Sequence, residues 1–157
     1  MKKTILFLQA AVVGLLAACN QPSDEEQLRD EIQYVNPFIG TGFHGHTFPG
    51  ATRPFALVQV SPDTQIMGWD ASSGNHYDDN QIYAFSHTHL SGTGIGDLGD
   101  VAILPFSGGD SIKPVAIFKK ETEKATPGYY AGRLDYFGFN VELSSTGRGG
   151  VQYLTLV

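Results

Sequence analysis

All five histidines of the chain lie between positions 44 and 89. They are His44 and His46, His76, and His87 and His89. Residues two apart on a strand face the same side, so each His-x-His pair can present two imidazoles to one ligand. With Asp97 or Asp100 added, such a pair is suited to zinc or iron. The imidazoles can instead bind sugar hydroxyls or brace their loops, and of these three interpretations we favour sugar binding.

The only tryptophan, Trp69, is followed by Asp70 at the start of a segment rich in glycine and serine. An exposed indole offers a flat apolar platform to the C–H face of a pyranose ring. A neighbouring carboxylate can accept hydrogen bonds from two vicinal hydroxyls. The alternative is a core tryptophan, but the flanking Gly68, Ser72 and Ser73 favour an exposed binding residue.

No catalytic residue is assigned from the sequence. The Gly-x-Ser-x-Gly pattern of an esterase elbow is absent, and Ser86 is adjacent to His87 in the chain rather than facing it. Several aspartates are present, but spacing alone does not establish the carboxyl pair of a glycosidase. The run GIGDLG at 94–99 has the letters of a dinucleotide fingerprint, yet a strand pattern rather than a helix follows it.

The elements that must position these residues are predicted to be strands. The 157 residues include 19 glycines, and this glycine content favours turn-rich β structure over helices. Short apolar or alternating runs recur at spacings of about 8 to 12 residues. The strand candidates are 55–60, closed by a turn at 61–63, then 81–89, 101–106, 114–119, 128–134, 139–143 and 151–156, with a hairpin around 135–138. We therefore predict an all-β sandwich with long binding loops at 40–52 and 68–80.

The N-terminus has the pattern of a bacterial sorting signal. Lys2 and Lys3 precede an apolar run that is too short to span a membrane, and the run ends in LAAC at 16–19. This ending resembles a lipobox, so we expect a lipoprotein signal peptide at 1–18 and lipidation of Cys19. Residues 19–33 are expected to be an acidic tether, and 34–157 the folded domain. A net charge of −6 with no basic cluster argues against a nucleic-acid partner.

Several ordered motifs resemble the opening of glycoside hydrolase family 92, the calcium-dependent exo-acting α-mannosidases. They are NPFIGTG at 36–42, GHTFPGAT at 45–52, QVSPDT at 59–64, GWD at 68–70 and FSHTHLSGTG at 85–94. The resemblance implies an N-terminal β-sandwich that packs on an (α/α)6 barrel and contributes loops to the mannose-binding cleft. It also implies inverting hydrolysis, with the catalytic carboxyls and the Ca²⁺ held by the barrel, which this chain lacks.

We accordingly predict a role in binding mannose-containing glycans at six residues: His46, Trp69, Asp70, His76, His87 and His89. No catalytic or metal-binding residue is assigned within the chain, and the fragment alone is expected to be inactive and truncated at its C-terminal end. The expected location is the bacterial outer membrane, facing the periplasm or the cell surface. The two other hypotheses are a free-standing carbohydrate-binding lipoprotein and a histidine-dependent metallohydrolase.

Overall fold

A computed structural model describes residues 31–65, 67–92, 99–107 and 115–157. The chain divides into two compact units, 1–34 and 35–157, and the second contains every strand named below. The expected signal peptide, the lipidation site at Cys19 and nearly all of the tether lie outside the described residues.

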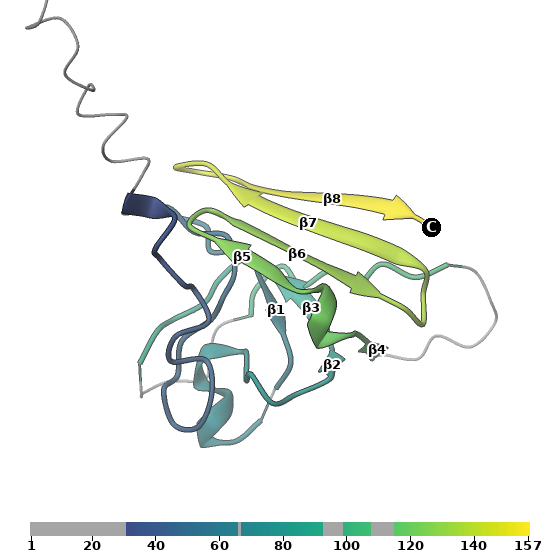
Figure 1. Cartoon of the computed structure of the whole chain (residues 1–157), viewed down its shortest axis with the longest axis horizontal. Helices are drawn as coiled ribbons and strands as arrows, with labels where there is room; N and C mark the ends of the chain where they lie inside the picture. The colour runs from purple at the N-terminus through teal and green to yellow at the C-terminus, as the bar shows by residue number, and fades with distance from the viewer. Residues whose placement is uncertain (1–30, 66, 93–98, 108–114) are drawn as a thin grey trace, which may run out of the picture. The chain divides into compact units, whose positions relative to one another are not determined.

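A four-stranded antiparallel sheet forms one layer of the domain (Figure 1). Its strands, in spatial and chain order, are β5 (Lys124–Thr126), β6 (Tyr129–Leu134), β7 (Phe139–Ser145) and β8 (Gly150–Leu156). A tight turn joins β6 to β7, in which the Gly138 N–H donates to the Leu134 carbonyl over 2.9 Å. The predicted hairpin around 135–138 is therefore confirmed.

Alternation of side chains explains why these segments form a half-buried sheet. Along β7, Val141, Leu143 and Ser145 are buried, whereas Asn140 and Glu142 are exposed. This period of two residues places every second side chain on the same face of the sheet. That face meets the second layer, and the opposite face carries the polar side chains of β7.

The second layer consists of two short ladders and the loops between them. Strand β1 (Ser61–Asp63) pairs with β3 (Ala84–Ser86), and β2 (Gln81–Ile82) pairs with β4 (Ala116–Ile117), both antiparallel. In the described part of 35–157, the helical elements are two 3₁₀ turns, η2 (Trp69–Ser73) and η3 (Lys120–Thr122). The all-β class is thus confirmed, with one regular layer and one irregular layer.

The hydrophobic core lies between the two layers. Its buried members are Ala51, Val60, Ile82, Phe85, Ala116, Phe118, Tyr130, Leu134, Phe137, Val141 and Leu143. Phe85 connects the two layers. Its backbone bridges to Ile103 in the second layer, and its carbonyl accepts a hydrogen bond from the side chain of Gln152 on β8. The core therefore holds the loop-bearing layer against the regular sheet.

The predicted strand at 55–60 is wrong, and so is the turn at 61–63. Phe55 has a φ of +58° and is fully exposed in a turn closed by the Ala56 N–H and the Arg53 carbonyl. The strand begins one residue after Val60, and it includes Pro62. Pro62 lies opposite Phe85 in this ladder, and the backbone N–H and carbonyl of Phe85 both bond to Ile103 instead of to β1. Proline is tolerated at this position because no hydrogen bond between β1 and β3 requires its missing N–H.

Two other predicted strands are shorter than expected. The run 101–106 makes only an isolated bridge at Ile103, since Val101 has a φ of +55°, which interrupts extended backbone. The run 114–119 pairs only over β4 and through a bridge at Phe118. The segments 81–89, 128–134, 139–143 and 151–156 all contain strands where the sequence predicts them.

Candidate functional site

Two loops of the second layer come together at the candidate site. The first, at 40–52, contains no strand, and the second begins with η2 and continues to Asn80. A hydrogen bond of 2.8 Å from the Tyr77 N–H to the Thr41 carbonyl ties them together. In the first loop Phe43 and His46 both have a φ of +51°, a conformation that non-glycine residues rarely adopt. The surrounding contacts must therefore hold this loop in its shape.

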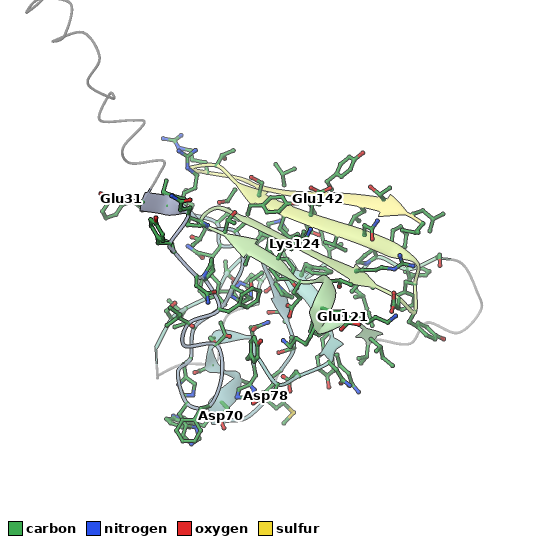
Figure 2. All side chains as sticks on the ribbon, in the orientation of Figure 1. Glu31, Asp70, Asp78, Glu121, Lys124 and Glu142 are labelled. Carbon is green, nitrogen blue, oxygen red and sulfur yellow. The ribbon has the colours of Figure 1, made fainter. Side chains whose placement is uncertain are left out.

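His44 and His46 converge on one carboxylate oxygen. Asp70 Oδ1 lies 2.6 Å from Nδ1 of His44 and 3.2 Å from Nε2 of His46. The His46 side chain is completely buried, whereas those of His44 and Asp70 are 47% and 39% exposed. Figure 2 shows Asp70 at the end of the loop layer farthest from the four-stranded sheet. The cluster is thus anchored at His46 and open to solvent at His44 and Asp70.

Trp69 packs against both imidazoles while remaining 56% exposed. Its ring centroid lies 4.4 Å from that of His46 with the planes at 82°, and 4.9 Å from that of His44 with the planes at 55°. Phe43 adds a tilted contact of 4.2 Å to His44. The result is an aromatic surface with a carboxylate at its edge.

The electrostatics of the site keep the carboxylate ionised. Hydrogen bonding from His44, and then from His46, holds the pKa of Asp70 below its usual value of 3.8, against a smaller opposing effect of burial. Stabilisation of the charged form is the expected result when a carboxylate accepts hydrogen bonds. Asp70 is therefore an acceptor and not a donor at neutral pH.

Four of the six residues predicted to bind sugar lie in this region. Trp69, Asp70 and His46 are in direct contact, and His76 joins the rim through a 3.1 Å contact from Nε2 to the Phe43 carbonyl. His44 is missing from the predicted set, although the His-x-His spacing that singled out His46 includes it. The His-x-His spacing therefore indicates both histidines, but it does not indicate which carboxylate they contact.

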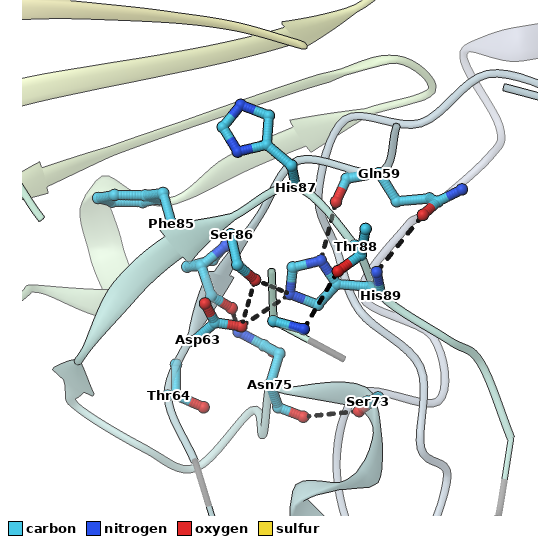
Figure 3. A network of polar contacts seen from close by, with 12 residues as sticks. Gln59, Asp63, Thr64, Ser73, Asn75, Phe85, Ser86, His87, Thr88 and His89 are labelled. Atoms are coloured by element: carbon cyan, nitrogen blue, oxygen red, sulfur yellow. Dashed lines mark hydrogen bonds and ion pairs between the residues drawn. The ribbon is translucent and has the colours of Figure 1, made fainter. Parts of the chain in front are cut away.

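His87 and His89 lie elsewhere and point in different directions (Figure 3). His89 is buried, with Nδ1 2.8 Å from the Gln59 carbonyl oxygen and Nε2 2.8 Å from Asp63 Oδ1. The Ser86 hydroxyl donates to the same Asp63 oxygen over 3.0 Å. His87 instead places Nδ1 2.8 Å from the Val101 carbonyl oxygen.

A small polar cavity of about 160 Å³ borders the buried network. Asp63, His89, Ser72, Gly74 and Thr88 are among its lining residues. Ser86 is completely buried, and its Oγ lies 3.3 Å from the same His89 Nε2 that contacts Asp63. In a nucleophilic triad the serine and the carboxylate contact opposite ring nitrogens, so the Ser86, His89 and Asp63 group is a structural contact between β1, β3 and the segment after β3.

Only one of the two His-x-His pairs has a geometry suited to a metal. The three atoms of His44, His46 and Asp70 that can act as ligands all lie within 4.8 Å of one another, and this is the only such group among the described residues. His87 and His89 do not converge, and Asp100 lies 3.4 Å from the Thr88 hydroxyl. Asp97 lies outside the described residues.

The fold and the site define a class: an all-β domain whose long loops bring an exposed tryptophan, a carboxylate and histidines together. A family model described as "Glycosyl hydrolase family 92 N-terminal domain" matches residues 34–156. The chain belongs to this family.

The similar proteins are glycosidases. The family GH92 α-mannosidase BT3965 from Bacteroides thetaiotaomicron superposes with a TM-score of 0.76 and 38% identity over 80% of this chain and 18% of that one. The inverting mannosidase BT2199 of B. thetaiotaomicron VPI-5482 has a TM-score of 0.63 and 25% identity over the same shares. An uncharacterized secreted glycosidase of Arthroderma benhamiae is 31% identical over 127 residues, 74% of this chain and 16% of its own length.

This chain thus spans less than a fifth of the length of these relatives. Within the described ranges, no helix has the length and apolar character needed to cross a membrane.

Proposed function

We propose that this chain is the N-terminal part of an exo-acting α-mannosidase and that its Trp69 surface contacts the sugar of a mannose-containing glycan. The observation that carries the proposal is the combination of an exposed indole with an ionised carboxylate whose position is fixed by two imidazoles. A pyranose ring has an apolar C–H face that can stack on the indole, and hydroxyl groups that can donate hydrogen bonds to the carboxylate.

Two atoms of the site, one on Asp70 and one on His44, can accept hydrogen bonds from a ligand. Both histidine contacts fall on Oδ1 of Asp70, and among the described residues Oδ2 remains able to accept from a sugar hydroxyl. His44 uses Nδ1 toward Asp70, so Nε2 of this 47% exposed side chain is the ring nitrogen that can face a ligand. The indole and these two atoms together form a platform with adjacent acceptors, which suits a vicinal diol.

Hydrolysis is assigned to a part of the enzyme beyond this chain. Inversion requires two carboxyls about 6.5–9.5 Å apart, with room for a water between them. The His44, His46 and Asp70 cluster supplies one carboxylate, and its Oδ1 is already in contact with two imidazoles. We therefore expect the chain by itself to bind sugar without cleaving it.

The calcium ion of the family does not fit the donors of this site. Ca²⁺ takes six to eight oxygen ligands, whereas the His44, His46 and Asp70 cluster supplies two nitrogens and one carboxylate. No step of the proposed function is routed through calcium here, and the ion is assigned to the catalytic domain.

The experiment pairs a binding measurement with an activity assay. We expect calorimetric titration of the chain with a mannobioside to give a saturable heat, and incubation with the same sugar and Ca²⁺ to release no mannose. Clear mannose release would contradict the assignment of catalysis to another domain. A titration without heat at millimolar sugar would contradict sugar binding by the Trp69 surface.

A free-standing carbohydrate-binding lipoprotein is the second candidate, because it needs only the same Trp69 surface. An added catalytic barrel domain distinguishes the two candidates. We expect it to restore mannoside hydrolysis if the chain is the N-terminal part of a mannosidase, and to have no effect if the chain is a free-standing binding protein. In either case we propose an outer-membrane lipoprotein anchored through Cys19. Metabolic labelling with palmitate tests this, and we expect the label to be lost in Cys19→Ser.

A further inference from the structure

In the His44, His46 and Asp70 cluster, two imidazole nitrogens converge on one carboxylate oxygen. Imidazole nitrogen and carboxylate oxygen are also the ligands that zinc takes in proteins. We propose that these three residues bind one zinc-class divalent cation, such as Zn²⁺ or Co²⁺. The proposal does not depend on the proposed function, since the same residues would bind the ion whether or not they contact sugar.

The distances between the donor atoms suit a tetrahedral ion. Zinc lies about 2.0–2.2 Å from imidazole nitrogen and carboxylate oxygen, so tetrahedral ligands are separated by roughly 3.3 Å. His46 Nε2 already lies 3.2 Å from Asp70 Oδ1, and His44 Nδ1 lies 2.6 Å from it. To hold the ion, His44 Nδ1 must move less than about 1 Å away from Asp70 Oδ1, and the two imidazole nitrogens, which lie within 4.8 Å of one another, must adjust to roughly 3.3 Å.

Burial divides the three ligands into one anchor and two adjustable groups. The His46 side chain is completely buried and its ring is held edge-on by Trp69. His44 and Asp70 are partly exposed and can move toward an ion. Their exposure also leaves the fourth coordination position to water, as in sites that keep an open position.

The donor set selects the class of ion. Imidazole and carboxylate together favour zinc-like and other late first-row ions, whereas calcium and magnesium prefer oxygen ligands alone.

One feature limits the affinity. Nδ1 of His46 is buried, and no described residue forms a hydrogen bond with it. When Nε2 binds a metal, Nδ1 must carry the proton, and most metal-binding histidines donate this proton to a carboxylate or carbonyl. The missing partner is expected to weaken binding by about 10- to 100-fold relative to a three-ligand site with a complete outer shell.

The test is a titration of the full chain, purified without a histidine tag, with Co²⁺ in the absence of sugar. Four- or five-coordinate Co²⁺ gives visible absorption bands that are far more intense than the weak absorption of hexaaquo Co²⁺. We expect these bands to saturate at one ion per chain and to disappear when Zn²⁺ is added. His44→Ala and Asp70→Asn should each abolish them.

Two matched variants control for adventitious binding. His87→Ala removes a histidine of the other His-x-His pair, and Asp78→Asn removes an exposed carboxylate of the second loop. Both should retain the Co²⁺ bands at full intensity. Circular dichroism of each variant establishes that it is folded. Absence of saturable bands, or bands that persist in both His44→Ala and Asp70→Asn, would overturn the proposal and leave an adventitious ion only. Failure of the sugar titration does not affect this result.

Discussion

The indole of Trp69 stands nearly perpendicular to the imidazole of His46, with the ring centroids 4.4 Å apart and the planes at 82°. Edge-to-face packing of this kind is a favoured geometry for ring pairs. Because His46 is completely buried, it supports the exposed indole from beneath. Asp70 adjoins Trp69 in the chain and contacts the same imidazole, so one buried histidine orients both the platform and its carboxylate.

Replacing Trp69 with alanine should weaken sugar binding without unfolding the domain. Removal of the platform eliminates ring stacking, worth about 1 kcal/mol, so we expect roughly a five- to tenfold loss of affinity for a mannobioside by calorimetry. Tyr153→Ala serves as the matched control, since Tyr153 is also an exposed aromatic residue but lies on β8. An equal loss in the two variants would argue against a specific role for Trp69.

Asp70→Asn should change how stability depends on acid. The pKa of Asp70 lies below 3.8 in the folded chain, because hydrogen bonds from His44 and His46 favour the carboxylate. A depressed pKa stabilises the fold above 3.8, and this stabilisation disappears as the pH falls through the folded-state value. We expect the melting temperature of the wild type to exceed that of Asp70→Asn at mildly acidic pH, and the two to converge below pH 3.8.

The control for this measurement is Asp78→Asn. Asp78 lies on the same loop, but its carboxylate is 4.0 Å from His76, beyond hydrogen-bond distance, and its side chain is 79% exposed. Its melting temperature should follow that of the wild type at every pH. A constant difference between wild type and Asp70→Asn across the acid range would show that the charge of Asp70 does not stabilise the cluster.

The regular sheet was predictable because its pattern is local. Val141 and Leu143 alternate with polar residues, and Gly138 lies within the turn between β6 and β7, so strands and hairpin are visible in the sequence. The run at 55–60 is equally apolar but does not form a strand. Its conformation depends on the positive φ of Phe55 and on contacts with distant segments, such as the bond from the Leu57 N–H to the Gly147 carbonyl.

The candidate site was predictable in composition but not in arrangement. Trp69 and Asp70 are adjacent in the chain, so their proximity needs no fold. The convergence of His44 and His46 on Asp70 joins residues 24 to 26 positions apart, and this depends on the path of both loops. His89 has the same motif as His46, yet Asp63 and Ser86 enclose it, and no local pattern distinguishes the two environments.

Gly74→Ala should destabilise the domain more than Gly128→Ala. Both glycines have positive φ, at +76° and +78°, so each substitution costs about 1–2 kcal/mol of backbone strain. A Cβ at Gly74 would also lie 2.7 Å from Asp63 Oδ1 and 3.1 Å from His89 Nε2, whereas at Gly128 the nearest atom is the Thr52 carbonyl oxygen at 3.8 Å. We expect a further loss of about 1–3 kcal/mol in Gly74→Ala by urea denaturation. Equal losses would show that the space between Gly74 and the buried pair relaxes freely.

Asp63 and His89 should be energetically coupled far more strongly than an exposed ion pair whose atoms lie the same distance apart. Asp63 Oδ1 and His89 Nε2 lie 2.8 Å apart with side chains only 9% and 2% exposed. Arg133 Nε and Asp135 Oδ1 lie at the same 2.8 Å, but their side chains are 43% and 28% exposed. Water screens the second pair, whereas removing one partner of the first leaves a buried polar group unpaired.

Double-mutant cycles measure this difference in coupling. The first cycle combines Asp63→Asn with His89→Gln, and the second combines Arg133→Gln with Asp135→Asn. From urea denaturation we expect a coupling of about 1–3 kcal/mol in the buried cycle and about 0.2–1 kcal/mol in the exposed one. A buried coupling no larger than the exposed one would mean that the 2.8 Å contact between Asp63 and His89 does not hold β1 against the segment after β3, and that the apolar core alone fixes this layer.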